Sequence, residues 1–224
     1  MPQKREGKIR IVSFSGIDGA GKSTQINLLQ QRLAAAGIRV IKLTFWQDVA
    51  VMVRLRASAS HNFFNSEEGI GTPEQPVNRR DKNIRTWYMA AVRFVLYFLD
   101  TLSLRAVFAR LVKTSAEVAI FDRYVYDELA NLSLQSRLAR AYVRLLLKLV
   151  PQPDIAYLLD ADPVAARRRK PEYPLEFLDS NRTTYLGLSD LGCPWTLIHA
   201  LPTYEVEQLI AEETLGVLPT FSTD

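Results

Sequence analysis

The sequence predicts an α/β fold in which helices cover both faces of a parallel sheet. Five short runs are almost continuously apolar, as strands buried on both faces are, and they lie at 9–14, 39–45, 118–121, 155–160 and 195–199. Helical patterns lie between or after these runs, at about 26–37, 83–113, 126–149 and 204–215. Strands that alternate with helices are typical of parallel sheets joined by right-handed crossovers.

The first helical pattern is the clearest. Ile26, Leu29 and Leu33 recur at intervals of three and four residues, and Gly37 is a suitable residue to end the helix. The pattern at 83–113 is apolar on more than one face, so we expect it to be buried on two sides. A core contact plus a dimer interface explains this composition better than a hydrophobic acceptor pocket. Arg93 and Asp100 interrupt it, and buried charges are usually paired or functional.

Composition bounds the class of protein. With 224 residues, 48% of them hydrophobic, the chain is long enough for one buried core, so residues 1–224 are predicted to form a single domain. A net charge of +4 fits a protein that handles small anions and is too weak to indicate nucleic-acid binding. The single cysteine, Cys193, excludes an internal disulfide, and no apolar stretch is long enough to span a membrane. We therefore expect a cytoplasmic protein.

Residues 14–25 read FSGIDGAGKSTQ and match the phosphate-binding pattern G-x-x-x-x-G-K-[ST]. The pattern follows a predicted strand and opens a predicted helix, where backbone N–H groups and the helix dipole attract a phosphate. Lys22 would reach the β- and γ-phosphates of ATP, and the Ser23 hydroxyl would ligate Mg²⁺. The predicted nucleotide-binding residues are Gly16, Asp18, Gly19, Ala20, Gly21, Lys22, Ser23 and Thr24. Kinases, ATPases and switch proteins all use such loops, but the N-K-x-D signature of a GTPase switch is absent.

A second candidate site element follows the strand at 118–121. Asp122 and Arg123 stand at the carboxyl end of that strand, the edge at which ligands of open α/β sheets gather. Asp122 could hold the Mg²⁺ shell, and Arg123 could bind a second anionic group. The alternative is an Asp–Arg pair that only caps the next helix.

Several further segments follow one another along the chain, namely GIDGAGKSTQ, FDRYVYDELA, PQPDIAYLLDADPVAARRRK, LEFLDSNRTTYLGL and YEVEQLI. In this order they resemble the thymidylate kinase family of nucleoside monophosphate kinases. The resemblance implies a P-loop NTPase fold of three α/β/α layers, with a five-stranded parallel sheet and a small lid. It also implies a homodimer formed through long helices.

The resemblance assigns roles to four residues. Asp18 matches the acid inside the phosphate loop, Arg123 the arginine that contacts the acceptor phosphate, and Arg93 an arginine along the acceptor site. Arg169 matches the arginine before the lid, which we place at about 167–176. Since Gly19 stands where some members carry an arginine, the lid is expected to supply the positive charge. The alternative for residues 167–170 is a solvated basic helix end.

The departures from the family pattern gather on the acceptor side. Ser15 stands where the family has an acid before the first loop glycine, and Met89 stands where an aromatic side chain stacks on the base. The family's A-Y-Q after D-R-Y is A-N-L here, at residues 130–132, so Asn131 and Leu132 replace the residues that read thymine. The acceptor is therefore dTMP held by other groups, such as the polar loop region at 46–82, or a different small molecule.

These observations predict a Mg-ATP-dependent kinase that transfers a phosphoryl group to a nucleoside monophosphate, with dTMP to dTDP as the first expectation. Lys22, Asp18, Arg123 and Arg169 are the predicted catalytic residues. The predicted metal ligands are Ser23 and Asp122, and the predicted acceptor-binding residues are Arg93, Asp122 and Arg123. Two alternatives remain: a kinase of another small-molecule acceptor, and a nucleotide-binding scaffold without turnover.

Overall fold

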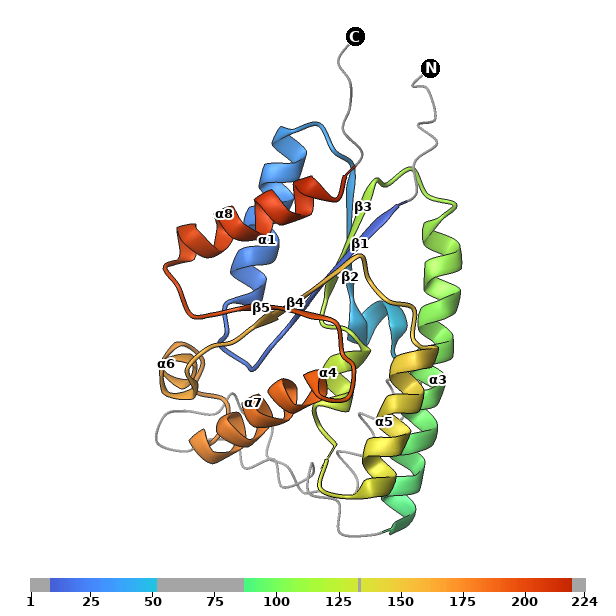
Figure 1. Cartoon of the computed structure of the whole chain (residues 1–224). Helices are drawn as coiled ribbons and strands as arrows, with labels where there is room; N and C mark the ends of the chain where they lie inside the picture. The colour runs from blue at the N-terminus through green and yellow to red at the C-terminus, as the bar shows by residue number, and fades with distance from the viewer. Residues whose placement is uncertain (1–8, 52–86, 133, 219–224) are drawn as a thin grey trace.

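The computed structural model describes residues 9–51, 87–132 and 134–218 (Figure 1). Within the long helix α3, Trp87–Leu111, it describes the side chain of Val92 and those from Phe94 onward. Five strands form one sheet in the order β2-β3-β1-β4-β5, and all four neighbouring pairs are parallel. The strands are β1 Arg10–Ser15, β2 Val40–Thr44, β3 Val118–Asp122, β4 Ile155–Leu159 and β5 Trp195–Ile198. The predicted fold class and all five predicted strands are confirmed.

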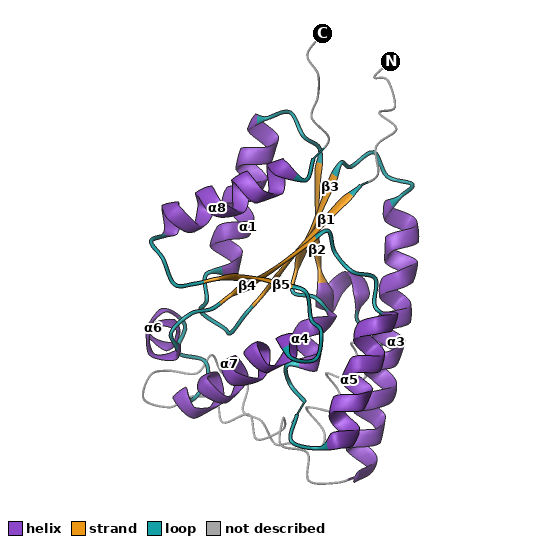
Figure 2. Ribbon diagram, in the orientation of Figure 1, coloured by secondary structure: helices purple, strands orange, loops and turns teal. Residues whose placement is uncertain are grey.

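Helices cover both faces of the sheet (Figure 2). α1 Lys22–Ala35 and α8 Thr203–Gly216 pack on one face, around a core that includes Phe14, Ile26 and Tyr157. The other face carries α3 Trp87–Leu111, α4 Val125–Leu129, α5 Arg137–Leu149 and α7 Leu175–Ser189. Because β1, β3 and β4 are covered on both sides, nearly all their residues are buried, which explains their apolar sequences.

Two segments differ from the sequence prediction. The pattern at 126–149, predicted as one helix, forms two, because α4 ends at Leu129 and α5 begins only at Arg137. The hydroxyl of Ser136 accepts the N–H of Ala139 and caps the start of α5. After β2 the chain forms a π-helix, η1 Phe45–Val49, where the strand was expected to include Phe45.

The carboxyl ends of the strands meet at one edge of the sheet because the strands are all parallel. At this edge β1 leads into α1, β3 into α4, β4 into the short helix α6 Pro163–Arg169, and β5 into α8. Most of the predicted acceptor-side loop at 46–82 lies outside the described residues, which resume at α3. Among the helices described, none is long and apolar enough to cross a lipid bilayer.

Candidate active site

The predicted phosphate loop forms the turn between β1 and the start of α1. α1 begins at Lys22 after the N-cap Gly21, and its first backbone bond runs from Gln25 N to Gly21 O (3.1 Å). The N–H groups before Gln25 therefore lie at the open end of the helix, where they can bind an anion together with the helix dipole. The loop has the local geometry that its sequence predicts.

Gly19 brings the loop into direct backbone contact with α6. Its φ is +83°, and a Cβ atom built on it would lie 2.2 Å from the carbonyl oxygen of Ala166. No side chain fits at this distance, so only glycine allows α6 to pack so closely. The contact explains why position 19 cannot hold the arginine that some family members place there.

The Lys22 side chain folds back over the loop. Its Nζ donates hydrogen bonds to Gly16 O (2.7 Å) and Ile17 O (2.9 Å), and the side chain is buried. Burial and the nearby Arg123 guanidinium lower the pKa of Lys22 to about 8, although the Asp127, Asp18 and Asp122 carboxylates oppose this shift. The ammonium group is thus held at the loop, where a bound phosphate would attract it.

Asp18 and Arg123 form an ion pair across the site, between Asp18 Oδ1 and Arg123 Nη2. Burial disfavours the ionised form of Asp18, but Arg123, Lys22 and Lys170 outweigh it and hold the pKa of Asp18 below its ordinary value. Arg123 has a φ of +69°, the left-handed conformation that is costly for a residue with a side chain. Its N–H donates to Phe14 O (3.0 Å), which fixes the turn after β3 to the end of β1.

These residues line one cavity of about 650 Å³. The predicted loop residues from Asp18 to Thr24 line it, as do Asp122, Arg123 and Arg169. Gly16 lies outside the lining, although its carbonyl binds Lys22. The structure therefore brings most of the predicted site residues to one place, although they come from three separate segments of the sequence.

The donor atoms at this cavity suit Mg²⁺. The Ser23 hydroxyl and the Asp18 and Asp122 carboxylates are hard oxygen ligands, and all three residues line the cavity. Within the part of the chain that the structure describes, no group of three or more His, Cys, Asp or Glu side chains could hold a metal alone. Mg²⁺ commonly binds through one or two protein oxygens together with nucleotide phosphates and water, so this donor set fits it.

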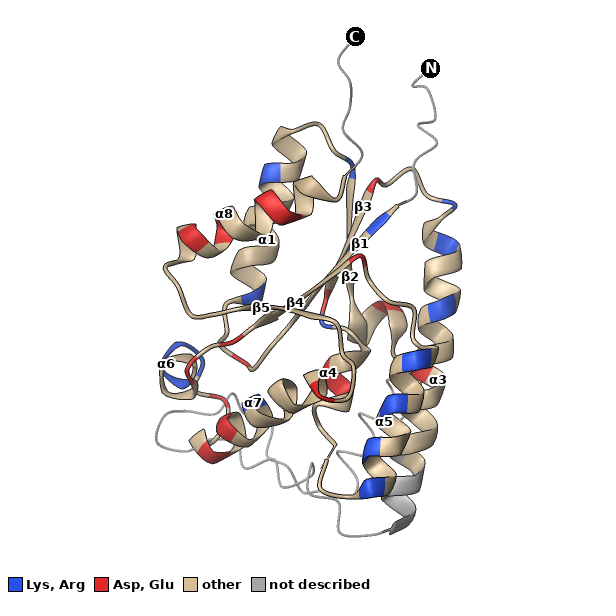
Figure 3. Ribbon diagram, viewed as in Figure 1, with Lys and Arg blue, Asp and Glu red and all other residues tan. Residues whose placement is uncertain are grey.

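The basic run at 167–170 divides into two pairs. Arg169 and Lys170 line the cavity, and Arg169 Nη1 lies 4.0 Å from where a Cβ on Gly21 would stand. Arg167 and Arg168 belong to the same last turn of α6, a helix that is basic in Figure 3, but they are not among the lining residues. Lys170 also forms an ion pair with Glu172 (3.2 Å). Only half of the basic run therefore lines the cavity.

The acceptor-side positions are only partly described. The side chains of Arg93 and Met89 lie outside the described residues, although both positions belong to α3. Leu132 is buried in the core beside α4, and Asn131 Nδ2 donates to Asp127 O (3.0 Å). Asp100, the second charge within α3, is buried and accepts the N–H of Val51 (2.8 Å). Leu132 and Asp100 thus have structural contacts away from the cavity.

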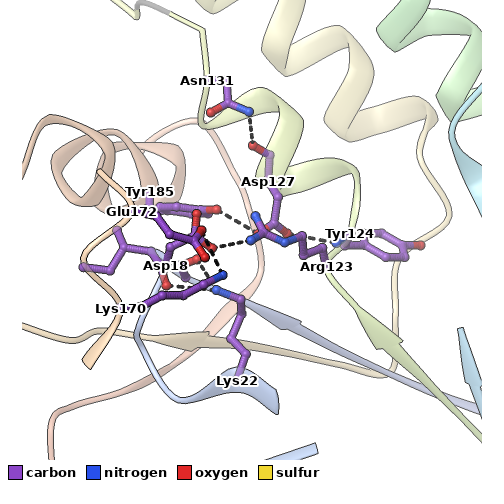
Figure 4. A network of polar contacts seen from close by, with 11 residues as sticks. Asp18, Lys22, Arg123, Tyr124, Asp127, Asn131, Lys170, Glu172 and Tyr185 are labelled. Atoms are coloured by element: carbon purple, nitrogen blue, oxygen red, sulfur yellow. Dashed lines mark hydrogen bonds and ion pairs between the residues drawn. The ribbon is translucent and has the colours of Figure 1, made fainter. Parts of the chain in front are cut away.

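The residues at the site that were not predicted from the sequence include two groups. One runs from the end of β5 into α8 and lines the cavity with Ile198, His199, Ala200, Leu201, Thr203 and Val206. The rule that ligands gather at the carboxyl ends of parallel strands could have identified it. The other is Asp127, whose carboxylate accepts hydrogen bonds from Ser15 Oγ (2.6 Å) and Tyr185 OH (2.8 Å) (Figure 4). The spacing of Asp127 from Tyr124 could have indicated a helix cap, but not these partners.

An ion pair between Arg182 and Asp160 clamps α7 to the end of β4. Arg182 donates to both carboxylate oxygens of Asp160, at 2.5 Å and 2.8 Å. Such bidentate pairs are strong and fix the orientation of both side chains. Asp160 lines the cavity, so the clamp positions α7, the helix that also carries Tyr185, relative to the phosphate loop.

Comparison with known proteins identifies three relatives, all of which are named as putative or probable thymidylate kinases. No protein-family model matches the chain. The chain is 30% identical over 166 residues to the "Putative thymidylate kinase" of Aeropyrum pernix, and the alignment covers 72% of this chain and 66% of that protein. It is 26% identical over 212 residues to the "Probable thymidylate kinase" of Methanopyrus kandleri, covering 90% of this chain and 89% of the relative. The protein of the same name from Methanosphaera stadtmanae is 23% identical over 203 residues, with 88% and 92% covered.

The chain thus spans about two thirds of the length of the first relative and about nine tenths of the other two. The relatives, the five-stranded parallel sheet and the phosphate loop at the start of α1 agree with one another. The chain belongs to the thymidylate kinase family.

Proposed function

We propose that the protein transfers the γ-phosphoryl group of ATP to a nucleoside monophosphate, with dTMP as the first candidate acceptor. The observation that carries the proposal is the cavity at the edge of the sheet. It places a phosphate loop, the Asp18–Arg123 pair and Arg169 around one space of about 650 Å³. A kinase needs this combination, because it must hold two anionic substrates close together while water is excluded.

Each residue has a role that follows from its position. The loop N–H groups and Lys22 would hold the phosphates of ATP, and Arg169 would stabilise negative charge on the transferred group. Arg123 would bind the acceptor phosphate in exchange for part of its contact with Asp18. Ser23 would hold Mg²⁺ directly, and Asp122 would do so directly or through water, and the bound ion would neutralise phosphate charge. No covalent intermediate on the protein is required.

The buried position of Leu132 favours a second candidate, a kinase for another small-molecule acceptor. Leu132 stands where the family's thymine-reading glutamine is expected, but it packs in the core and offers no hydrogen bond. A site that lacks a partner for a polar base discriminates poorly for that base.

The acceptor is tested by measuring ADP release from Mg-ATP with dTMP, dUMP, the other nucleoside monophosphates, and simple sugar and lipid-precursor alcohols. Turnover with dTMP supports the first candidate, and turnover only with another acceptor supports the second. ATP binding without turnover for any acceptor would contradict both and favour a scaffold.

Arg123→Ala should raise the KM for the acceptor about 100-fold while changing ATP affinity little, since the guanidinium is assigned to the acceptor phosphate. Steady-state kinetics at saturating ATP measures the first quantity, and calorimetric titration with ATP measures the second. Arg32→Ala is the matched control, because Arg32 forms an ion pair with Glu207 (2.8 Å) outside the cavity. Equal losses in acceptor use and ATP affinity would contradict the assigned role.

We also propose that two copies associate through α3, as the family resemblance predicts. Val92, Val95, Phe98 and Leu102 leave 39–58% of their surface exposed and follow one another at intervals of three and four residues, so they lie along one side of the helix. A long exposed apolar stripe of this kind is typical of an interface between proteins.

Val95→Asp should convert a dimer to a monomer, because it places a charge in the middle of the apolar stripe. Light scattering at several protein concentrations measures the mass. Leu209→Asp on α8, in the opposite layer, is the control and should leave the mass unchanged; Leu209 is similarly exposed at 46%. A wild-type protein that is already monomeric would rule out this interface.

A further inference from the structure

Ser15 and Asp127 are hydrogen-bonded partners at the base of the phosphate loop. Ser15 Oγ donates to Asp127 Oδ2 (2.6 Å), and both residues are buried although 112 positions separate them. Ser15 is also the position at which the family pattern has an acid, directly before the first loop glycine. The acid absent from position 15 is therefore replaced by another carboxylate in direct contact with that position.

We propose that Asp127 is a positioning residue for phosphoryl transfer, and that it supplies from α4 the carboxylate that the family pattern supplies from the end of β1. The inference rests on the proposed kinase function. In this chain the acid of the Ser15–Asp127 pair stands at position 127 and the hydroxyl at position 15, so the buried site contains one carboxylate and one hydrogen-bond donor.

The contacts of Asp127 join three elements of the site (Figure 4). Its Oδ2 accepts from Ser15 Oγ at the end of β1 and from the backbone N–H of Tyr124 (2.9 Å). Its Oδ1 accepts from Tyr185 OH on α7 (2.8 Å). Both carboxylate oxygens are thus acceptors, which an ionised carboxylate provides and a neutral amide provides at one atom only.

These contacts fix the residues next to the reacting groups. Ser15 immediately precedes Gly16, whose carbonyl holds Lys22, and Tyr124 immediately follows Arg123. Arg123 has a left-handed backbone, which persists only where its surroundings hold it. By bonding both neighbours, Asp127 sets the distance between the phosphate loop and the turn that carries Arg123.

Asp127 acts through these neighbours and not on the reactants. It is buried behind the loop and is not among the residues that line the cavity. Its negative charge also acts with Asp18 to raise the pKa of Arg123 against the effect of burial. A carboxylate here therefore supports both the position and the charge of the acceptor-binding arginine.

The alternative is a purely structural role, in which Asp127 only caps α4. The two roles differ in the activity of the folded molecules. A cap adds stability, so its loss lowers the melting temperature but leaves kcat per folded molecule unchanged. A positioning residue changes kcat as well, because misplacement of the reacting groups by about 1 Å costs about 100-fold.

The experiment exchanges the two side chains. Ser15→Asp, Asp127→Ser and the double variant are compared with wild type for kcat, acceptor KM, ATP affinity and melting temperature. Asp127→Ser should lower kcat/KM by about 10- to 100-fold. Ser15→Asp should be at least as damaging, because it places two buried carboxylates in contact. The double variant should recover part of the loss, because it restores one carboxylate and one hydroxyl in contact, with the acid at position 15, although Tyr185 OH loses its carboxylate partner.

Two further variants keep the test decisive if a member of the cycle does not fold. Asp127→Asn keeps the shape but removes the charge and one acceptor, and it should lower kcat per folded molecule at least tenfold, by the same displacement of the reacting groups. Asp154→Asn is the matched structural control, since Asp154 accepts Ile11 N (2.8 Å) and pairs with Arg10 (2.9 Å) at the opposite end of the sheet. It should lower the melting temperature and leave kcat/KM within about twofold.

The outcomes separate this inference from the proposed function. If the wild-type protein shows no turnover, the kinase proposal is rejected. The role of Asp127 is then tested by the ATP affinity of Ser15→Asp, Asp127→Ser and the double variant. Recovery in the double variant, in turnover or in ATP affinity, supports the inference. A double variant that folds but is no better than Asp127→Ser overturns it, as does an Asp127→Asn variant with wild-type kcat.

Discussion

Lys22→Ala is expected to lower kcat by about 10²–10³-fold, the loss that follows removal of one donor to developing charge in a desolvated site. Lys22 is the buried cation of the phosphate loop, and its Nζ is held by Gly16 O and Ile17 O. Alanine leaves these two carbonyls without the ammonium and removes the positive charge from the ATP phosphates. Single-turnover measurement of phosphoryl transfer reports the chemical step directly.

The control for this variant is Lys113→Ala, which removes an exposed lysine of equal charge just beyond α3. Circular dichroism and thermal unfolding establish that both variants fold. Wild-type turnover by a folded Lys22→Ala variant would remove the phosphate loop from the mechanism.

Arg169→Ala is expected to have an even larger effect, a loss in kcat of about 10³–10⁵-fold, the range measured for arginines that stabilise phosphoryl transfer. Arg169 lines the cavity at the end of α6 and lies over Gly21, while the loop position Gly19 has no charge of its own. We therefore expect α6 to supply the charge that some family members supply from the loop. ATP affinity should fall far less than kcat, because the interaction strengthens in the transition state.

Arg168→Ala provides a closely matched comparison, because Arg168 is the preceding residue of the same helix, is exposed and does not line the cavity. Its kcat should remain within about threefold of wild type, as expected for a surface charge. Similar losses for Arg168→Ala and Arg169→Ala would show that the basic run acts only through its total charge.

The sheet could be predicted from the sequence because each strand is marked by the residues of the strand itself. A strand buried on both faces needs a short apolar run, and each of the five runs corresponds to one strand whose ends lie within one residue of the predicted ends. The helices after β3 could not be separated in this way, because the apolar pattern continues across the break between α4 and α5. The start of α5 is fixed by the Ser136 cap, a local hydrogen bond that is not visible as periodicity.

The same distinction applies to the site. Lys22 and Ser23 belong to one contiguous motif, so their position could be predicted. Arg123 was predicted from its place after a strand and from the family resemblance, and Arg169 from the resemblance. Asp127 was not predicted because its partners Ser15 and Tyr185 lie 112 and 58 positions away. Sequence comparison showed only a missing acid at position 15, whereas the structure shows the carboxylate that stands beside it.

The contact between Gly19 and α6 limits how this protein could change in evolution. A side chain at position 19 would force α6 away from the loop, and Arg169 would move with the helix that carries it. The two known sources of positive charge, loop and lid, therefore cannot be exchanged here one substitution at a time. An exchange between them requires α6 to move away from position 19, and this movement would also carry Arg169 away from the cavity. We therefore expect relatives with glycine at this loop position to retain the lid arginine.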